Sequence, residues 1–414
     1  MRIAMVLASA LALTAASVAQ PSFTHEKRID LTPHFTGNPI GDLVSDVAFD
    51  GTNAYVIGAR SASGLGPVGV VKVNNVLGSH SLQDLLTLDQ DGVRDAKIVY
   101  HEGNIYIATG MGNATGNPAT TGVRKYDTSG NQDVLFSTDG QIMPAELDTS
   151  ARLDGLGIDP GVGGGPMLAI MCRGRGIVFR ADLASGAYVT ANRIVAPTNP
   201  NTWRDVAFDR FGQIYARMDN DVFYGRRTSA TTLSGNTFVK IIDLPDSTLR
   251  FNMNTEYFET TQGDRLVINS RELDTNNDDV VKKALIYAHN GTAWALEQEL
   301  TGAEPLPDNS VPEAFRTGIL SFTSADVGGQ NYLFIAHHSP RLFLQADING
   351  DGIVDDTDLA MVLEAFGNAG IGLPEDVNDD GVVDDTDLAI VLESFGMIEP
   401  PSKWLDIYRE NIDE

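Results

Sequence analysis

Two acidic segments near the end of the chain have the residue types and spacing of a cation-binding site. Residues 347–358 and 376–387 are nearly identical and lie 29 residues apart. In each twelve-residue loop, oxygen-bearing side chains occupy positions 1, 3, 5, 9 and 12, and position 7 offers a backbone carbonyl. The predicted ligands are Asp347, Asn349, Asp351, Ile353, Asp355 and Asp358, followed by Asp376, Asn378, Asp380, Val382, Asp384 and Asp387.

This set of ligands favours calcium. Calcium is a hard cation that takes six to eight oxygen ligands, and a twelve-residue loop surrounds it when a glycine at position 6 allows a sharp turn. Gly352 and Gly381 occupy that position. Both loops end in Asp, where an EF-hand loop ends in Glu. We therefore expect two calcium ions in loops that differ from an ordinary EF-hand.

Each loop precedes a predicted short helix, over residues 359–366 and 388–395, with Leu, Val, Leu and Phe at positions i, i+3, i+4 and i+7. These apolar faces are expected to pack together. No helix is expected before either loop, because residues 341–345 have a strand pattern and residues 370–374 form a linker rich in glycine.

The duplicated loop-then-helix unit ending in Asp resembles the dockerins. The resemblance covers residues 347–396 and implies docking to a cohesin domain of a secreted scaffold. Positions 10 and 11 of each loop help to select the partner in that family, and here they are Asp356, Thr357, Asp385 and Thr386. The alternative is that calcium only folds a small tether, because some 50 residues supply little hydrophobic core.

The charge of the chain limits its partners. With 29 basic and 56 acidic residues, the formal net charge is −27. Residues 347–414 alone contain 19 acidic and 2 basic residues. Such a chain repels nucleic acid and anionic membranes, so neither is expected as a partner.

The first 346 residues contain a repeated pattern of short strands. Six copies of an apolar strand, four of them with an early Asp, recur at spacings of about 50 to 60 residues, near the length of a four-stranded propeller blade. Second, third and fourth strands follow in most copies, and the sixth copy lacks a fourth strand. Residues 26–31 are the unassigned strand that would complete it. The pattern predicts a mainly β protein with a six-bladed β-propeller; a seven-bladed ring and paired sandwiches are alternatives.

Several residues of this repeat could contribute to a channel site. The starts of the inner strands carry the acids Asp46, Asp95, Asp154, Asp205 and Glu256, with Arg94 and Arg204 alongside. A ring of acids could bind a metal or protonate a glycosidic oxygen. The alternative is that acids repeated in every blade accept hydrogen bonds from neighbouring backbone groups. No catalytic motif is present, so the sequence names no catalytic residue.

Two other sites are expected to be inert. Cys172 lies in an apolar strand, where a buried thiol is expected, and as the single cysteine it excludes an intramolecular disulfide. His337 and His338 follow a predicted strand and are expected on a surface turn rather than in a zinc site.

The start of the chain indicates export. Residues 1–19 combine a basic start, an apolar run and small residues before Ala19, which is the pattern of a cleaved secretory signal peptide. No later stretch is apolar enough to span a bilayer. The predicted organisation is a signal peptide at 1–19, a propeller at 20–346, the dockerin-like domain at 347–396 and a tail at 397–414.

Two functional hypotheses follow. The dockerin resemblance implies a secreted carbohydrate-active enzyme, a hydrolase or lyase, that takes part in polysaccharide breakdown. The alternative is a non-catalytic extracellular propeller that binds a glycan or a protein, with the calcium domain as its tether. Turnover of a glycan, as against saturable binding without turnover, would distinguish them.

Overall fold

The structure is a computed structural model. It describes residues 22–35, 44–59, 68–88, 96–109, 122–142, 153–162, 164–172, 177–188, 192–195, 203–218, 221–233, 238–244, 254–273, 279–312, 314–315, 320–338, 346–349, 353–370, 373–378, 380–397 and 403–412. At positions 59, 153–154, 172, 270–273 and 279–282 it describes the backbone only.

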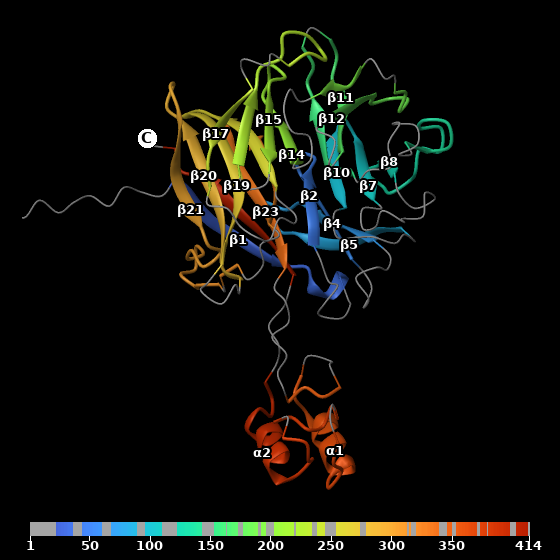
Figure 1. The fold of residues 1–414 in the computed structure, drawn as a ribbon, viewed down its shortest axis with the longest axis vertical. Coiled ribbons are helices and arrows are strands. Elements are labelled where there is room, and N and C mark those ends of the chain that lie inside the picture. The colour runs from blue at the N-terminus through green and yellow to red at the C-terminus, as the bar shows by residue number, and fades with distance from the viewer. Residues whose placement is uncertain are drawn as a thin grey trace, which may run out of the picture.

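Twenty-four strands of the described residues form six antiparallel four-stranded sheets (Figure 1). Blades one to three contain β2 (Val44–Phe49), β3 (Ala54–Ala59), β4 (Val68–Asn74) and β5 (Ser81–Leu88); β6 (Lys97–His101), β7 (Asn104–Thr109), β8 (Gly122–Asp127) and β9 (Gln141–Ile142); β10 (Leu153–Asp159), β11 (Met167–Cys172), β12 (Ile177–Asp182) and β13 (Ile194–Val195). Blades four and five contain β14 (Trp203–Phe208), β15 (Ile214–Met218), β16 (Asp221–Gly225) and β17 (Val239–Ile242); β18 (Thr255–Thr260), β19 (Gly263–Leu273), β20 (Asp279–His289) and β21 (Trp294–Leu300).

The six sheets close into a ring. The innermost strands contact one another in the order β2, β6, β10, β14, β18 and β22 (Leu320–Val327), and β22 contacts β2 again. Each blade begins with its inner strand and steps outward, as the alternation of short apolar strands and turns predicts. The prediction of a six-bladed β-propeller is therefore confirmed. Closure of the ring leaves only short, protected sheet edges.

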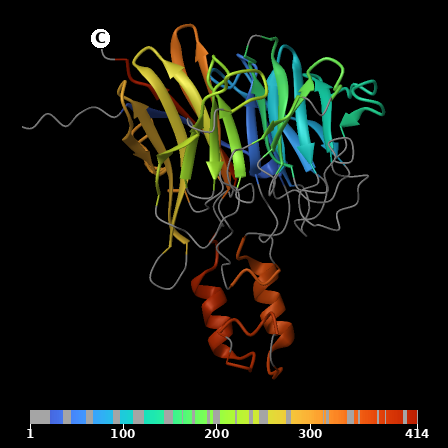
Figure 2. The same cartoon turned by 45° about the horizontal axis from the view of Figure 1, so that its top comes forward.

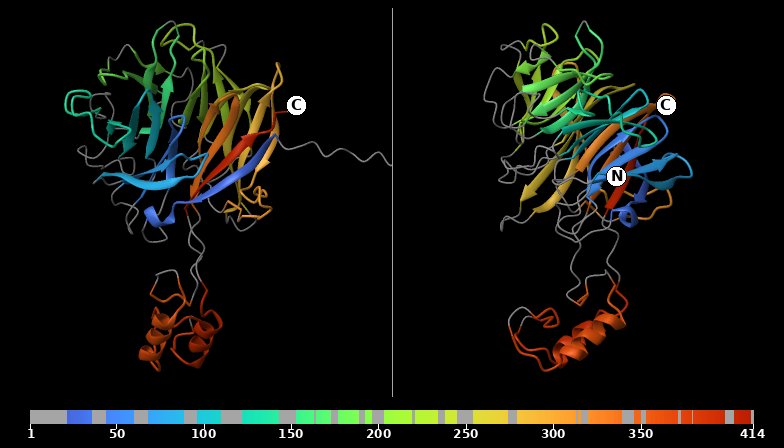
Figure 3. Two further views of the ribbon diagram at one scale, coloured as in Figure 1. Left: turned by 180° about the vertical axis from the view of Figure 1, so that it is seen from behind. Right: turned by 90° about the vertical axis from the view of Figure 1, so that its right-hand side faces the viewer.

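The sixth blade joins the two ends of the chain. Its strand order is β1 (Phe23–Asp30), β24 (Lys403–Glu410), β23 (Gln330–His338) and β22. β1, β24 and β23 run side by side in Figure 3. The expectation that an N-terminal strand completes this blade is confirmed, and a short 3-10 turn (Thr32–His34) follows it.

The predicted third strand of this blade was wrong. Residues 341–345, to which the sequence pattern assigned it, lie outside the described residues, and β24 pairs with both β23 and β1 instead. Residues 397–414 are therefore no separate tail. β24 buries Leu405, Ile407 and Tyr408, so hydrophobic burial explains why it completes the blade.

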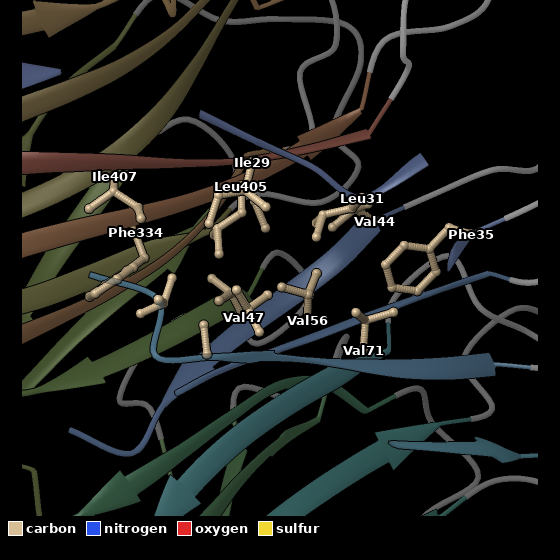
Figure 4. Packing of buried hydrophobic residues seen from close by; sticks show 14 residues of the cluster. Ile29, Leu31, Phe35, Val44, Val47, Val56, Val71, Phe334, Leu405 and Ile407 are labelled. Atoms are coloured by element: carbon tan, nitrogen blue, oxygen red, sulfur yellow. The ribbon is translucent and has the colours of Figure 1, made fainter. Parts of the chain in front are cut away.

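A continuous core seals the junction between the sixth and first blades. Ile29 and Leu405 from the last blade lie against Val47 and Val56 from the first, as Figure 4 shows. Phe35 and Phe334 extend this cluster at either end. Because both ends of the chain contribute to this core, it stabilises the closed ring.

Two further sequence predictions need correction. The fourth strand of the second blade is β9, not residues 134–137, which form a turn with Val134 and Leu135 exposed. His337 and His338 are buried in β23 and do not lie on a surface turn, because pairing with β24 covers them. The side chain of Cys172 lies outside the described residues.

The acidic segment contains two helices, α1 (Asp356–Ala365) and α2 (Asp385–Glu393). They lie outside the ring of sheets (Figure 2). In the chain, this segment is inserted between β23 and β24, two adjacent strands of the sixth blade. In the part of the chain that is described, no helix has the length and apolar character needed to cross a membrane.

Candidate calcium loops and central channel

The two helices start in the same way. Asp355 and Asp384 are the N-cap residues, and their side chains accept hydrogen bonds from the backbone N–H groups of Thr357 and Thr386, both at 2.8 Å. Three residues after each cap, an Asp completes a capping box. The predicted ligands at positions 9 and 12 therefore also begin the helices.

The position-12 carboxylates are fully buried. Asp358 Oδ1 accepts hydrogen bonds from the backbone N–H groups of Ile348 and Asn349, at 2.7 and 3.0 Å. Asp387 Oδ1 accepts one from Asn378 N at 3.1 Å, and Oδ2 accepts one from Asp384 N at 2.8 Å. Each carboxylate thus ties the start of its loop to the start of its helix.

The second loop folds back at position 6. Gly381 has a φ of +91°, a left-handed conformation that favours glycine, and its N–H donates to Asp376 Oδ2 at 2.8 Å. Asp380 accepts hydrogen bonds from Val382 N and from the Asn378 amide. The predicted ligands at positions 1, 3 and 5 therefore face the same turn.

In the first loop, Asp347, Asn349 and Ile353 are described, whereas Asp351 and Gly352 lie outside the described residues. Among the residues that are described, no group of three or more His, Cys, Asp or Glu side chains is close enough to form a metal site by itself. The carboxylates of the second loop instead accept hydrogen bonds from the backbone of the loop.

The charge of this module nevertheless fits a cation. Residues 347–396 contain 14 acidic residues and no Lys, Arg or His. Asp358 and Asp387 are 0% exposed, and Asp347 and Asp376 are almost as buried. Buried charges in proteins are paired or coordinate metals, and no cationic side chain of this module pairs with these carboxylates. Hard oxygen donors of this kind match calcium.

The two halves of the module clasp each other. Val354 in the first loop exchanges backbone hydrogen bonds with Gly396 and Met397 after α2, at 2.8 and 2.9 Å. Val383 in the second loop makes the equivalent pair with Gly367 and Asn368 after α1. The first of these pairs brings the beginning and the end of the module together, which suits an insertion between neighbouring strands.

The helix faces are only partly buried, contrary to the sequence expectation. Val362 and Val391 are fully buried in a small core with Val354 and Val383, and Leu359 and Leu388 pack against it. The later residues of each predicted face, Leu363, Phe366, Leu392 and Phe395, are roughly half exposed. A core of this size cannot cover them. The predicted partner-selecting residues Asp356, Thr357, Asp385 and Thr386 are exposed on the first turns of the same helices.

The acids of the inner strands link neighbouring blades. Asp46 Oδ2 accepts a hydrogen bond from Ile98 N in the second blade, and Asp205 Oδ2 accepts one from Thr255 N in the fifth, both at 2.9 Å. Glu256 Oε1 accepts from Ser324 N at 3.0 Å and from its hydroxyl at 2.9 Å. Of the remaining predicted channel residues, Arg94 and Asp95 and the side chain of Asp154 lie outside the described residues, and Arg204 is buried in β14.

These acids line a cavity of about 290 Å³ at the centre of the ring. Lys97 of the second blade contacts Asn254, next to the fifth blade, across the channel. Burial raises the pKa of Asp46 to about 6, although the nearby Lys97 opposes this change. Burial likewise raises the pKa of Glu256 to about 8, against the hydrogen bonds from Ser324. The sequence does not reveal Lys97 and Asn254, since neither belongs to the repeated pattern.

No family model and no curated protein matches the chain. Similar solved structures include one called the structure of YjhT, which is 13% identical, with 73% of this chain and 96% of that chain covered and a TM-score of 0.42. Another is a catalytically inactive virginiamycin B lyase from Staphylococcus aureus with quinupristin, 10% identical, with coverages of 77% and 85% and a TM-score of 0.40.

A mutant of the GH43 protein BlXynB from Bacillus licheniformis is also similar, at 9% identity, coverages of 76% and 52% and a TM-score of 0.35. These proteins differ widely in their described activities. Likeness at this level assigns no activity to the chain.

Proposed function

We propose that this is a secreted protein whose dockerin-like module binds two calcium ions and docks the propeller to a cohesin-like or cell-surface partner in polysaccharide breakdown. The observation that carries the proposal is the burial of carboxylates in duplicated loops whose module lacks any basic residue. In each loop, the side chains at positions 1, 3, 5, 9 and 12 and the carbonyl at position 7 would hold the ion. Calcium neutralises the buried charge and thereby stabilises the module.

Calcium titration by calorimetry tests this function. The wild-type protein is expected to bind two ions, and the double variant Asp347→Ala/Asp376→Ala none, with NMR signals of the module losing dispersion in both the variant and the chelated wild type. Asp356→Ala/Asp385→Ala is the matched control, because it removes equal charge from exposed positions outside the ligand set. Two-site binding that survives the first pair of substitutions would contradict the proposal.

Docking is proposed to use the exposed surface of the helices. The 29-residue repeat places Leu363 and Phe366 of α1 in positions equivalent to Leu392 and Phe395 of α2, so the module presents two similar apolar patches. Exposed apolar patches flanked by polar side chains are typical of protein interaction sites. A cohesin domain titrated onto the calcium-loaded protein should bind, and Leu363→Lys/Leu392→Lys should abolish binding without changing calcium affinity.

Export is tested by the start of the mature protein. N-terminal sequencing of protein recovered from culture medium should give Gln20 as the first residue, since cleavage is proposed after Ala19. A protein found only inside the cell, and still starting at Met1, would contradict secretion.

A non-catalytic role for the propeller is the second candidate. It is favoured by the hydrogen bonds that tie Asp46, Asp205 and Glu256 to the next blade, because acids with this structural task are poorly placed for acid–base chemistry. Incubation with soluble polysaccharides should then release neither reducing ends, as a hydrolase would, nor unsaturated ends, as a lyase would. Release of either product would favour the carbohydrate-active enzyme.

A further inference from the structure

A second cavity lies between the fourth and fifth blades, away from the central channel. It measures about 590 Å³ and opens to the surface. Asp209, Tyr215 and Tyr224 line it from the fourth blade, and Asp264 and Trp294 line it from the fifth. The two blades thus contribute opposite walls.

The position of this cavity separates it from the calcium module. Its lining residues come from the ends of strands where the first and second strands of a blade, or the third and fourth, connect. The module is inserted in the connection between a second and a third strand. Because antiparallel strands reverse direction at each connection, these two kinds of connection lie on opposite faces of the ring.

Aromatic rings form the apolar part of the cavity. Tyr215 is buried and anchors the group: its ring lies 5.8 Å from that of Trp294 at 84° and 5.4 Å from that of Tyr224. Tyr224 and Trp294 are partly exposed. His289 packs beside Trp294, with the ring centroids 5.1 Å apart. The packed tyrosine therefore holds the two exposed rings in place before any ligand arrives.

Polar groups complete the lining. Asp209 and Asp264 supply carboxylate acceptors, and the tyrosine hydroxyls can donate or accept. The Asp209 carboxylate is held by backbone N–H groups of Phe211 and Gln213, at 2.9 and 2.8 Å to Oδ1. Lys240, at the rim, is engaged by Asp221 at 2.8 Å and by Asp243 at 3.1 Å. The carboxylates therefore dominate the charge of the cavity.

We propose that this cavity binds a sugar ring of a glycan, and that the sugar is neutral or carries an amino group. Sugar rings present C–H faces that pack on aromatic rings and hydroxyls that donate to carboxylates. Small-molecule sites combine an apolar lining with a few fixed polar groups in this way. A uronic acid or sulfated sugar is disfavoured, because its charge would face Asp209 and Asp264.

This proposal deepens the binding role of the propeller and does not depend on the calcium loops. The test uses the full-length protein and isothermal titration with cellohexaose, a glucosamine hexamer and oligogalacturonate, each in calcium and in chelator. Binding of one of the first two probes is expected, with equal affinity in both buffers. Failure to bind either, or equal binding of oligogalacturonate, would overturn the proposal and leave the calcium function untouched.

Variants locate the binding site. Trp294→Ala should weaken binding about tenfold, as expected for the loss of an aromatic contact, and Trp294→Phe should restore most of it. Asp264→Asn should weaken binding without altering the fold. Phe211→Ala is the matched control, because Phe211 is an exposed aromatic residue on a neighbouring turn outside the lining. Unchanged affinity in a folded Trp294→Ala variant would show that any glycan binds elsewhere.

Discussion

Two ion pairs join the same strands, β1 and β24, but differ in burial. Arg28–Asp406 and Arg409–Glu26 each have a shortest N–O distance of 2.6 Å, yet the first is buried and the second partly exposed. His25 and His337 also contact Asp406, at 3.4 and 3.2 Å. Asp406→Asn leaves Arg28 as an unpaired buried charge, so it should destabilise the protein by about 3–5 kcal/mol.

Glu26→Gln is the control for this prediction and should cost less than about 1 kcal/mol, since exposed pairs contribute little. Urea unfolding followed by tryptophan fluorescence gives both values. Equal effects of the two substitutions would mean that burial is not what makes the Asp406 pair important.

The carboxyl of Glu256 gives the propeller a pH dependence. Its pKa in the folded protein is raised to about 8, mainly by burial, from an ordinary value of 4.5. The folded state therefore holds the proton more tightly than the unfolded state, and this stabilisation is present below about pH 4.5 and is lost as the pH rises through about 8. Glu256→Gln should lessen the fall in melting temperature between pH 5 and 9. Glu102→Gln, on an exposed turn, should leave that fall unchanged; an unaltered pH profile in Glu256→Gln would contradict the prediction.

At the scale of elements, β24 holds the sixth blade together. It pairs with β23 on one side and β1 on the other, and its apolar residues enter two core clusters. A chain ending at residue 402 should therefore lose cooperative unfolding, whereas a chain ending at residue 412 should unfold like the wild type. Differential scanning calorimetry distinguishes these outcomes. A folded protein without β24 would mean that another segment, such as residues 341–345, takes its place.

At the scale of the molecule, the inserted module and the propeller should unfold separately. The 64 residues between His338 and Lys403 form a loop whose ends are close, because these two residues are paired in the sheet. The Val354–Met397 clasp shortens the effective loop when the module is folded. Removing calcium lengthens the flexible part roughly threefold, which should destabilise the propeller by only about 1 kcal/mol.

A variant in which Asn-Gly joins His338 directly to Lys403 checks this independence, since a two-residue turn suits antiparallel strands. It should fold and melt at the same temperature in calcium and in chelator. Loss of the propeller in this variant would show that the module is needed for folding, and a large effect of chelator on the variant would place calcium in the propeller.

The sequence by itself determined the features that depend on neighbouring residues. Loop positions, helix starts at Asp355 and Asp384, and the alternating strands of five blades are local patterns, because backbone conformation and burial repeat over a few residues. Only the tertiary structure decided that Lys403–Glu410 completes the sixth blade between β1 and β23. Pairing between segments some 380 residues apart depends on which strands meet in space, and an intervening acidic module conceals the link. The cavity formed by Tyr215 and Trp294 emerged for the same reason, since its walls come from two blades.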